Sequence, residues 1–131
     1  MQITKTDINA IIDEIFNNNV IAGWYTDPKT GERIVRNVPE MMMLMVSEIS
    51  EAMEGYRKKL QDDKMPEVSM VAAEMGDVFI RWADLCGYLK SLNYPDMDQM
   101  DEVIEKKRHY NANRSDHKLE NRKNDPNGKD F

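Results

Sequence analysis

Cysteine is almost absent from this chain of 131 residues. Cys86 stands alone, which excludes an intramolecular disulfide and a zinc site built from several cysteines, and we expect it to pack as a small core residue. Long apolar runs are lacking too: the longest covers residues 41–46, whereas a membrane span needs roughly 18 residues. The N-terminal residues show no basic segment followed by an apolar one. We therefore expect no secretory signal, no membrane partner and a cytoplasmic location.

Basic residues are scarce over most of the chain. Residues 1–105 carry 10 basic and 20 acidic side chains, a balance of −10, while residues 106–131 carry 8 basic and 4 acidic ones, a balance of +4. The net charge of −6 argues against binding of nucleic acid. An acidic body can still handle phosphates where divalent cations neutralise its carboxylates.

Valine, isoleucine and threonine are sparse outside two short stretches, so we expect an all-α fold. Apolar periodicity and proline positions predict about four helices, at residues 6–18, 39–61, 66–92 and 96–111, with Thr6 and Asp96 as N-caps and residues 17–19 ending the first helix. A turn signal at residues 27–31 suggests a small hairpin in the connection 20–39. Residues 1–111 form the helical bundle in this prediction, and residues 112–131 an irregular basic tail of the same domain.

Two pairs of carboxylates are the main candidates for functional residues. Glu48-Ile-Ser-Glu51 lies on the second predicted helix and Glu74-Met-Gly-Asp77 on the third, and residues at i and i+3 share a helix face. Each pair borders an apolar stripe. We expect the two helices to pack antiparallel through those stripes, which we place at Ile49, Ala52, Tyr56, Val71, Val78 and Trp82.

Such packing brings four carboxylates together, which is costly unless a cation compensates them. Oxygen ligands favour a hard cation, Mg²⁺ with Mn²⁺ as the alternative. The competing interpretation is that these acids are solvated and paired with Arg57, Lys58 or Arg81. A di-iron bundle is disfavoured, because neither His109 nor His117 follows a glutamate by three residues.

The paired motifs resemble those of the MazG-like family of all-α nucleotide pyrophosphohydrolases. The hallmark of that family is ExxE on one helix and ExxD on the next. The end of the chain adds to the resemblance, since it reads Lys107-Arg-His-Tyr110-Asn111-Ala-Asn-Arg114-Ser-Asp-His117-Lys118 and closes with Gly128-Lys129-Asp-Phe131. The match covers roughly residues 5–131.

The resemblance implies hydrolysis of a nucleoside triphosphate to the monophosphate and pyrophosphate. It makes Glu48, Glu51, Glu74 and Asp77 the metal ligands, with Glu51 or Glu48 orienting or deprotonating the attacking water. It assigns Lys107 and Asn111 to phosphate and sugar, and it suggests Trp24 as the aromatic residue against the base. Arg114 is a further candidate for binding phosphate. The family also implies a homodimer or homotetramer.

Two alternatives remain open. One is an all-α dUTPase-like enzyme with the same acids and a stricter pocket. The other is a helical interaction module that is not an enzyme, whose acidic faces are solvated and whose tail binds an acidic partner.

Overall fold

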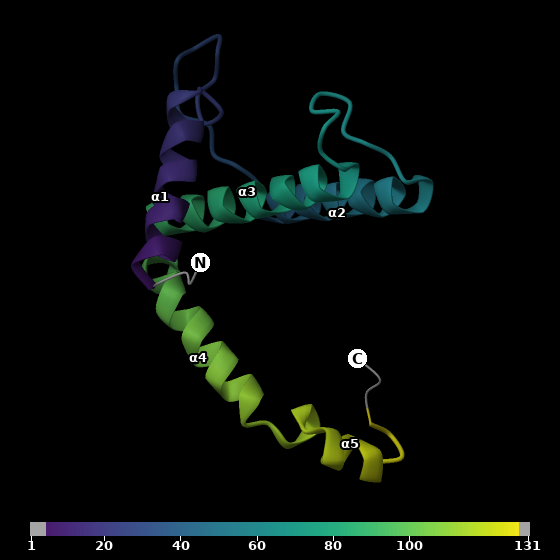
Figure 1. Cartoon of the computed structure of the whole chain (residues 1–131). Helices are drawn as coiled ribbons and strands as arrows, with labels where there is room; N and C mark the ends of the chain where they lie inside the picture. Colours follow the sequence, from purple (N-terminus) through teal and green to yellow (C-terminus); the bar gives the residue numbers. More distant parts are fainter. Residues whose placement is uncertain (1–4, 129–131) are drawn as a thin grey trace.

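The computed structural model describes residues 5–128, and its regular elements are all helices, joined by connections that are longest at residues 22–37 and 59–69 (Figure 1). Its elements run in the order α1 (Lys5–Ile21), α2 (Val38–Lys58), α3 (Met70–Ser91), the 3-10 turn η1 (Met97–Gln99), α4 (Met100–Ala112), the 3-10 turn η2 (Ser115–His117) and α5 (Leu119–Asn124). Among these residues there is no strand, and only two isolated antiparallel bridges occur, Thr26–Arg33 and Gln61–Ser69. The expectation of an all-α fold is confirmed.

Helices α2 and α3 lie side by side and antiparallel, as expected (Figure 1). Both begin with a side-chain cap: the backbone N–H of Glu40 donates to Asn37 Oδ1 at 2.9 Å, and that of Ala72 donates to Ser69 Oγ at 3.2 Å. These bonds satisfy amides that have no partner within the helix. The caps therefore fix where each helix starts, and with it the register of the acidic residues that follow.

Helix α1 crosses the C-terminal half of α3, and the core lies at this crossing (Figure 1). One buried cluster joins Tyr25, Met41, Leu85 and Tyr88, and a second joins Ile12, Ala83 and Cys86 with Trp82 packed against it. Cys86 thus packs in the core, as expected. Gly87 permits the close approach of the two helices, because an added Cβ would lie 2.3 Å from the Phe16 Cβ.

The connection between α1 and α2 is anchored from both ends. Thr26 bridges to Arg33 around the turn at residues 27–31, so the expected hairpin exists in its shortest form. The Tyr25 hydroxyl donates to Asp84 Oδ2 at 2.9 Å, and the Arg36 backbone N–H donates to the Tyr88 hydroxyl oxygen at 2.9 Å. These bonds tie Tyr25 and Arg36, near the two ends of the connection, to α3, while residues 28–35 between them are exposed.

Helix α4 leads away from the α2–α3 pair and carries the tail with it (Figure 1). It is held near its start by α1, where the Asp101 backbone N–H donates to Asn9 Oδ1 at 3.3 Å. The tail is less irregular than expected, since it contains η2 and the short helix α5.

Several expected helix bounds are wrong. Helix α1 includes Thr6, so this residue is not its N-cap, and it continues through the asparagines at 17–19 to Ile21. Helix α3 starts four residues later than expected because Ser69, not the region of Pro66, supplies the cap. Asp96 has a positive φ of 67° and its side chain caps no backbone amide; it accepts a bond from the Gln99 side chain instead.

The expected contacts between α2 and α3 are also wrong in part. Ala52 is buried, but Ile49 is 47% and Tyr56 77% exposed. Ile49 and Tyr56 belong instead to an apolar stripe along α2, whose members are spaced four and three residues apart. Each member is at least 47% exposed, and the stripe consists of Met42, Val46, Ile49, Met53 and Tyr56. Helix α3 has exposed apolar side chains of its own, Met75 and Phe79. The stripe faces away from α3 in the single chain.

None of the helices in residues 5–128 combines the length and the apolar character that crossing a membrane requires.

Candidate metal centre

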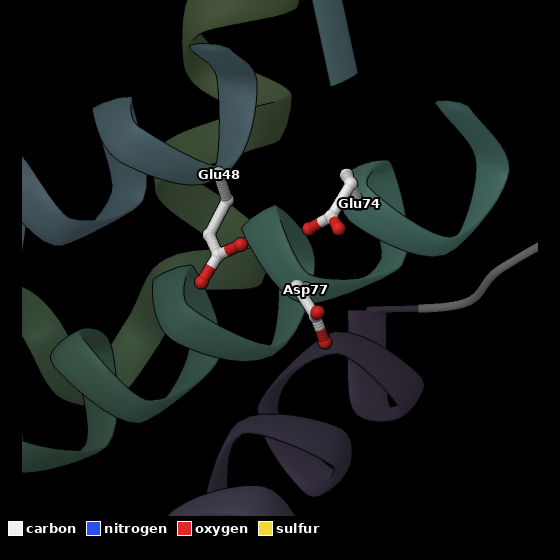
Figure 2. Close-up of side chains that lie close together, drawn as sticks. All are labelled: Glu48, Glu74 and Asp77. Carbon is white, nitrogen blue, oxygen red and sulfur yellow. The ribbon is translucent and has the colours of Figure 1, made fainter. Parts of the chain in front are cut away.

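Three of the four predicted ligands converge where α2 faces α3. Glu48 comes from α2, and Glu74 and Asp77 come from adjacent turns of α3 (Figure 2). One carboxylate oxygen from each lies within 4.8 Å of the others. Because two helices supply the group, its geometry depends on their packing and not on any single motif.

Glu74 is the most constrained of the three. Glu74 is only 9% exposed. Its Oε2 atom is enclosed and accepts no hydrogen bond from any residue in the part of the chain that the structure describes. Burial, together with the neighbouring carboxylates of Glu48 and Glu51, raises the pKa of Glu74 from 4.5 to about 7. An enclosed oxygen without a donor, held among other anions, marks a position where a cation would be stabilised.

Glu48 differs from Glu74 because it has a cationic partner. Arg81 Nε donates to Glu48 Oε1 at 2.8 Å, and Glu48 itself is 9% exposed. Burial alone would raise the pKa of Glu48, but the bond and charge of Arg81, with a hydrogen bond to Glu74, outweigh it and lower that pKa. The interpretation that these acids are merely solvated is therefore wrong for Glu48 and Glu74, although its suggested pairing with Arg81 is confirmed. Arg57 and Lys58 pair with Glu54 instead.

Glu51, the fourth predicted ligand, lies outside the group of three. It is exposed, one turn after Glu48 on α2, and its charge is close enough to help raise the pKa of Glu74. The structure thus separates the acids into three that converge and one at their edge.

The donor set fits a hard divalent cation. All donors are carboxylate oxygens, they come from two rigid helices, and at least one of them is buried without a donor. Magnesium and manganese prefer such ligands and keep positions open for water or phosphate. In residues 5–128 no cysteine or histidine joins the group, so a thiolate or imidazole site is not formed there.

A cavity of about 440 Å³ adjoins the acids. Besides Glu48 and Asp77, it is lined by two guanidinium groups, an indole and a further carboxylate, contributed by Arg36, Arg81, Trp24 and Asp84. Trp24 is 67% exposed, and so it is available to a ligand on the rim of the cavity. Cations, an exposed aromatic face and clustered carboxylates in one cavity suit a ligand that is both phosphorylated and aromatic.

The structure does not bring the predicted phosphate-binding residues of the C-terminal region to this cavity. Lys107 lines a separate hollow with Val103 and Tyr110 on α4. Arg114 makes two hydrogen bonds to Asp116, at 2.9 and 2.6 Å. Asn111 also lies on α4, and its enclosed Oδ1 accepts no bond from the residues described. Since α4 leads away from α2 and α3, these three residues do not reach the acids within one chain (Figure 1).

Sequence reasoning did not anticipate the role of Arg36 or Tyr25. Both lie in the connection 20–39, which has no helical periodicity to place its side chains. Tyr25 is only 2% exposed and stacks on Tyr88 with ring centroids 5.3 Å apart, while the Arg36 guanidinium lies 5.6 Å from the Tyr25 ring centroid. The unusual length of the connection was the available signal.

Comparisons of the chain with models of protein families, with curated proteins and with solved structures yield no match.

Proposed function

We propose that this protein is a nucleoside triphosphate pyrophosphohydrolase that depends on Mg²⁺, with Mn²⁺ as the alternative ion. The observation that supports this most is the juxtaposition of three carboxylates, one of them buried without a donor, with a cavity lined by two arginines and an exposed tryptophan. The resemblance of the ExxE and ExxD motifs to the MazG-like family points to the same chemistry.

Each residue near the acids has a role in this proposal. Glu48, Glu74 and Asp77 hold the cation; when bound, it neutralises the polyphosphate and acidifies water at the site. Glu51, exposed at the edge of the group, accepts the proton of the attacking water. Trp24 stacks on the base.

The arginines serve the phosphates. Arg81 donates to Glu48 through Nε, and 39% of its side chain is exposed. Its remaining N–H groups and those of Arg36 are donors of the kind that match phosphate oxygens. Both arginines lie on the same cavity as the acids, so this part of the site is complete within one chain.

We further propose that the protein is a homo-oligomer. The apolar stripe along α2, at Met42, Val46, Ile49, Met53 and Tyr56, has the spacing of a coiled-coil seam and has no partner in the described residues of one chain. A second copy offers the same stripe and buries both. Assembly is also the route by which Lys107, Asn111 and Arg114 of one chain reach the acids of another.

The direct test is turnover. Purified protein is incubated with each common nucleoside triphosphate, with Mg²⁺, with Mn²⁺ or with EDTA, and pyrophosphate and orthophosphate are measured separately. We expect pyrophosphate with either metal and none in EDTA. Glu74→Gln should reduce turnover by orders of magnitude, whereas Glu54→Gln, a change of the same kind on α2 outside the group, should not. Release of orthophosphate alone, or equal rates for both variants, would contradict the proposal.

Metal and size measurements separate the alternatives. An interaction module with solvated acids should show no Mg²⁺-dependent rise in melting temperature. A dUTPase-like enzyme should hydrolyse dUTP far faster than the other triphosphates. For the oligomer, Met53→Glu should yield monomers in light scattering, since it places a charge within the stripe. A wild-type protein that is already monomeric at micromolar concentration would contradict the oligomer alone.

A further inference from the structure

Arg81 is a cation that the chain itself supplies to the candidate metal centre. It follows Asp77 by four residues and Glu74 by seven on α3, so all three lie on one face of that helix. From there its Nε donates to Glu48 Oε1 on α2 at 2.8 Å. The guanidinium is therefore bonded to one of the three carboxylates that Figure 2 shows together and that the proposed function assigns to the metal.

The rest of the guanidinium is open to the cavity. Arg81 lines the cavity of about 440 Å³, and 39% of its side chain is exposed. Its terminal nitrogens, Nη1 and Nη2, donate to no acceptor among residues 5–128, and neither is one of the enclosed atoms that lack a partner there. A ligand in the cavity can therefore reach these donors.

Arg81 has opposite effects on the two ligands of the proposed site. A divalent cation beside Glu48 is repelled by the guanidinium, because both are positive and both are drawn to the same carboxylate. Phosphate oxygens attract the guanidinium instead, and its paired N–H groups match their geometry. A phosphate that takes up these N–H groups neutralises the guanidinium and weakens its hold on Glu48.

We propose that Arg81 couples the binding of metal to the binding of phosphate. It balances the charge of Glu48 until phosphate oxygens in the cavity take up its N–H groups, and Glu48 then becomes available to the cation. Metal and phosphate thus bind with positive cooperativity, and the site accepts a polyphosphate best together with its cation. This inference rests on the proposed function, because it takes the acids as metal ligands and the cavity as the phosphate site.

The exposure of the ion pair sets the expected size of the coupling. Coupling between two ligands typically corresponds to about 5- to 150-fold in affinity. Because 39% of the Arg81 side chain is exposed, water screens its interaction with Glu48, and we expect the low end of that range, about 5- to 10-fold. Linkage makes the effect reciprocal, so each ligand should tighten the other by the same factor.

Calorimetry on the full chain measures this coupling. The protein is titrated with Mg²⁺ without and with saturating orthophosphate, and with orthophosphate without and with saturating Mg²⁺. All affinities refer to free concentrations, so complexes of Mg²⁺ with phosphate in solution do not count. Wild type is compared with Arg81→Gln, Arg81→Lys and Arg36→Gln. Arg36 is the matched control, because it lines the same cavity but donates to the Trp24 carbonyl oxygen and not to Glu48.

The variants should separate the effects of Arg81 from those of charge in general. Arg81→Gln should bind Mg²⁺ alone about 5-fold more tightly, bind orthophosphate more weakly and lose most of the coupling. Arg81→Lys keeps the charge, so it should bind Mg²⁺ alone about as wild type does. Arg36→Gln should weaken orthophosphate binding and leave both the Mg²⁺ affinity and the coupling unchanged. Cooperativity from a direct contact between metal and phosphate survives in Arg81→Gln, so the difference from wild type measures the part due to Arg81.

Three results would overturn the inference. The first is independent binding of Mg²⁺ and orthophosphate to wild type, which needs no variant. The second is a folded Arg81→Gln that keeps the wild-type coupling. The third is an Arg36→Gln protein that gains as much Mg²⁺ affinity as Arg81→Gln does, since this would show a general effect of charge.

The two proposals fail in different ways. If triphosphates release pyrophosphate but Mg²⁺ and orthophosphate bind independently, the proposed function stands and only the coupling by Arg81 is wrong. If the coupling is found and depends on Arg81 but no triphosphate is hydrolysed, the coupling stands and the proposed function is wrong. If the protein binds no Mg²⁺ under any of these conditions, both are wrong.

Discussion

Replacing Glu74 by glutamine should stabilise the protein in the absence of metal. In the folded chain the pKa of Glu74 is raised from 4.5 to about 7, because the carboxyl is buried and lies beside Glu48 and Glu51. At about 1.4 kcal/mol per pKa unit, this difference corresponds to about 3 kcal/mol of folding free energy that is lost when Glu74 ionises. The glutamine has nearly the same shape and no charge, so we expect it to recover about 2 kcal/mol of this at pH 8, or roughly 6 °C in melting temperature.

The sign of the pH dependence follows from proton binding. Between about pH 4.5 and pH 7 the folded protein keeps the Glu74 proton and the unfolded chain releases it, so the folded state binds more protons. Wild-type stability should therefore fall as pH rises through this window and level off above it. The stability of Glu74→Gln should not show this fall with pH, and its gain in stability over wild type should vanish near pH 4.5.

The assay is thermal and urea unfolding in EDTA from pH 4.5 to pH 9, at one protein concentration, with Glu54→Gln as the control. Glu54 sits on α2 and pairs with Arg57 and Lys58, so its replacement should not reproduce the gain. Added Mg²⁺ should reverse the order, because wild type gains stability by binding the ion and the variant has lost a ligand. A Glu74→Gln protein that melts below wild type at pH 8 in EDTA would show that the carboxylate holds the fold together, and would refute the reasoning.

Three further outcomes are expected. Arg81→Gln should lower stability in EDTA by about 1 kcal/mol, because it leaves buried Glu48 without its cation, and should tighten Mg²⁺ binding in calorimetry; unchanged values for both would mean that the pair contributes nothing. Gly87→Ala should lower the unfolding free energy by about 2 kcal/mol through overlap with Phe16, whereas Gly76→Ala, where an added Cβ meets nothing within 4 Å, should be neutral or stabilising; equal melts would contradict this. Deletion of residues 112–131 should raise KM and leave helicity nearly unchanged, since it removes one six-residue helix; an unchanged KM would show that the tail does not contact substrate.

The sequence alone determined the class of fold and the placement of the acids on two facing helices. Apolar periodicity and the sparseness of β-branched residues favour helices over strands along the chain, and i, i+3 spacing puts two carboxylates on one face of any helix. Helix ends were less predictable. The asparagines at 17–19 have low helix propensity, yet α1 continues through them to Ile21, and its backbone bonds run on until the Ala22 N–H donates to the Asn18 carbonyl oxygen at 2.9 Å.

Only the tertiary structure decided which charges meet. A motif fixes neighbours along one helix, whereas the pairing of Glu48 with Arg81 and the isolation of the Glu74 oxygen depend on how α2 and α3 are set against each other. The same is true of Tyr25 and Asp84, which are 59 residues apart in the chain. Ile49 and Tyr56, expected in the core by their periodicity, lie exposed because a helix with two apolar faces can turn only one of them to α3. Periodicity reports that a face is apolar; the packing of the whole chain determines what covers it.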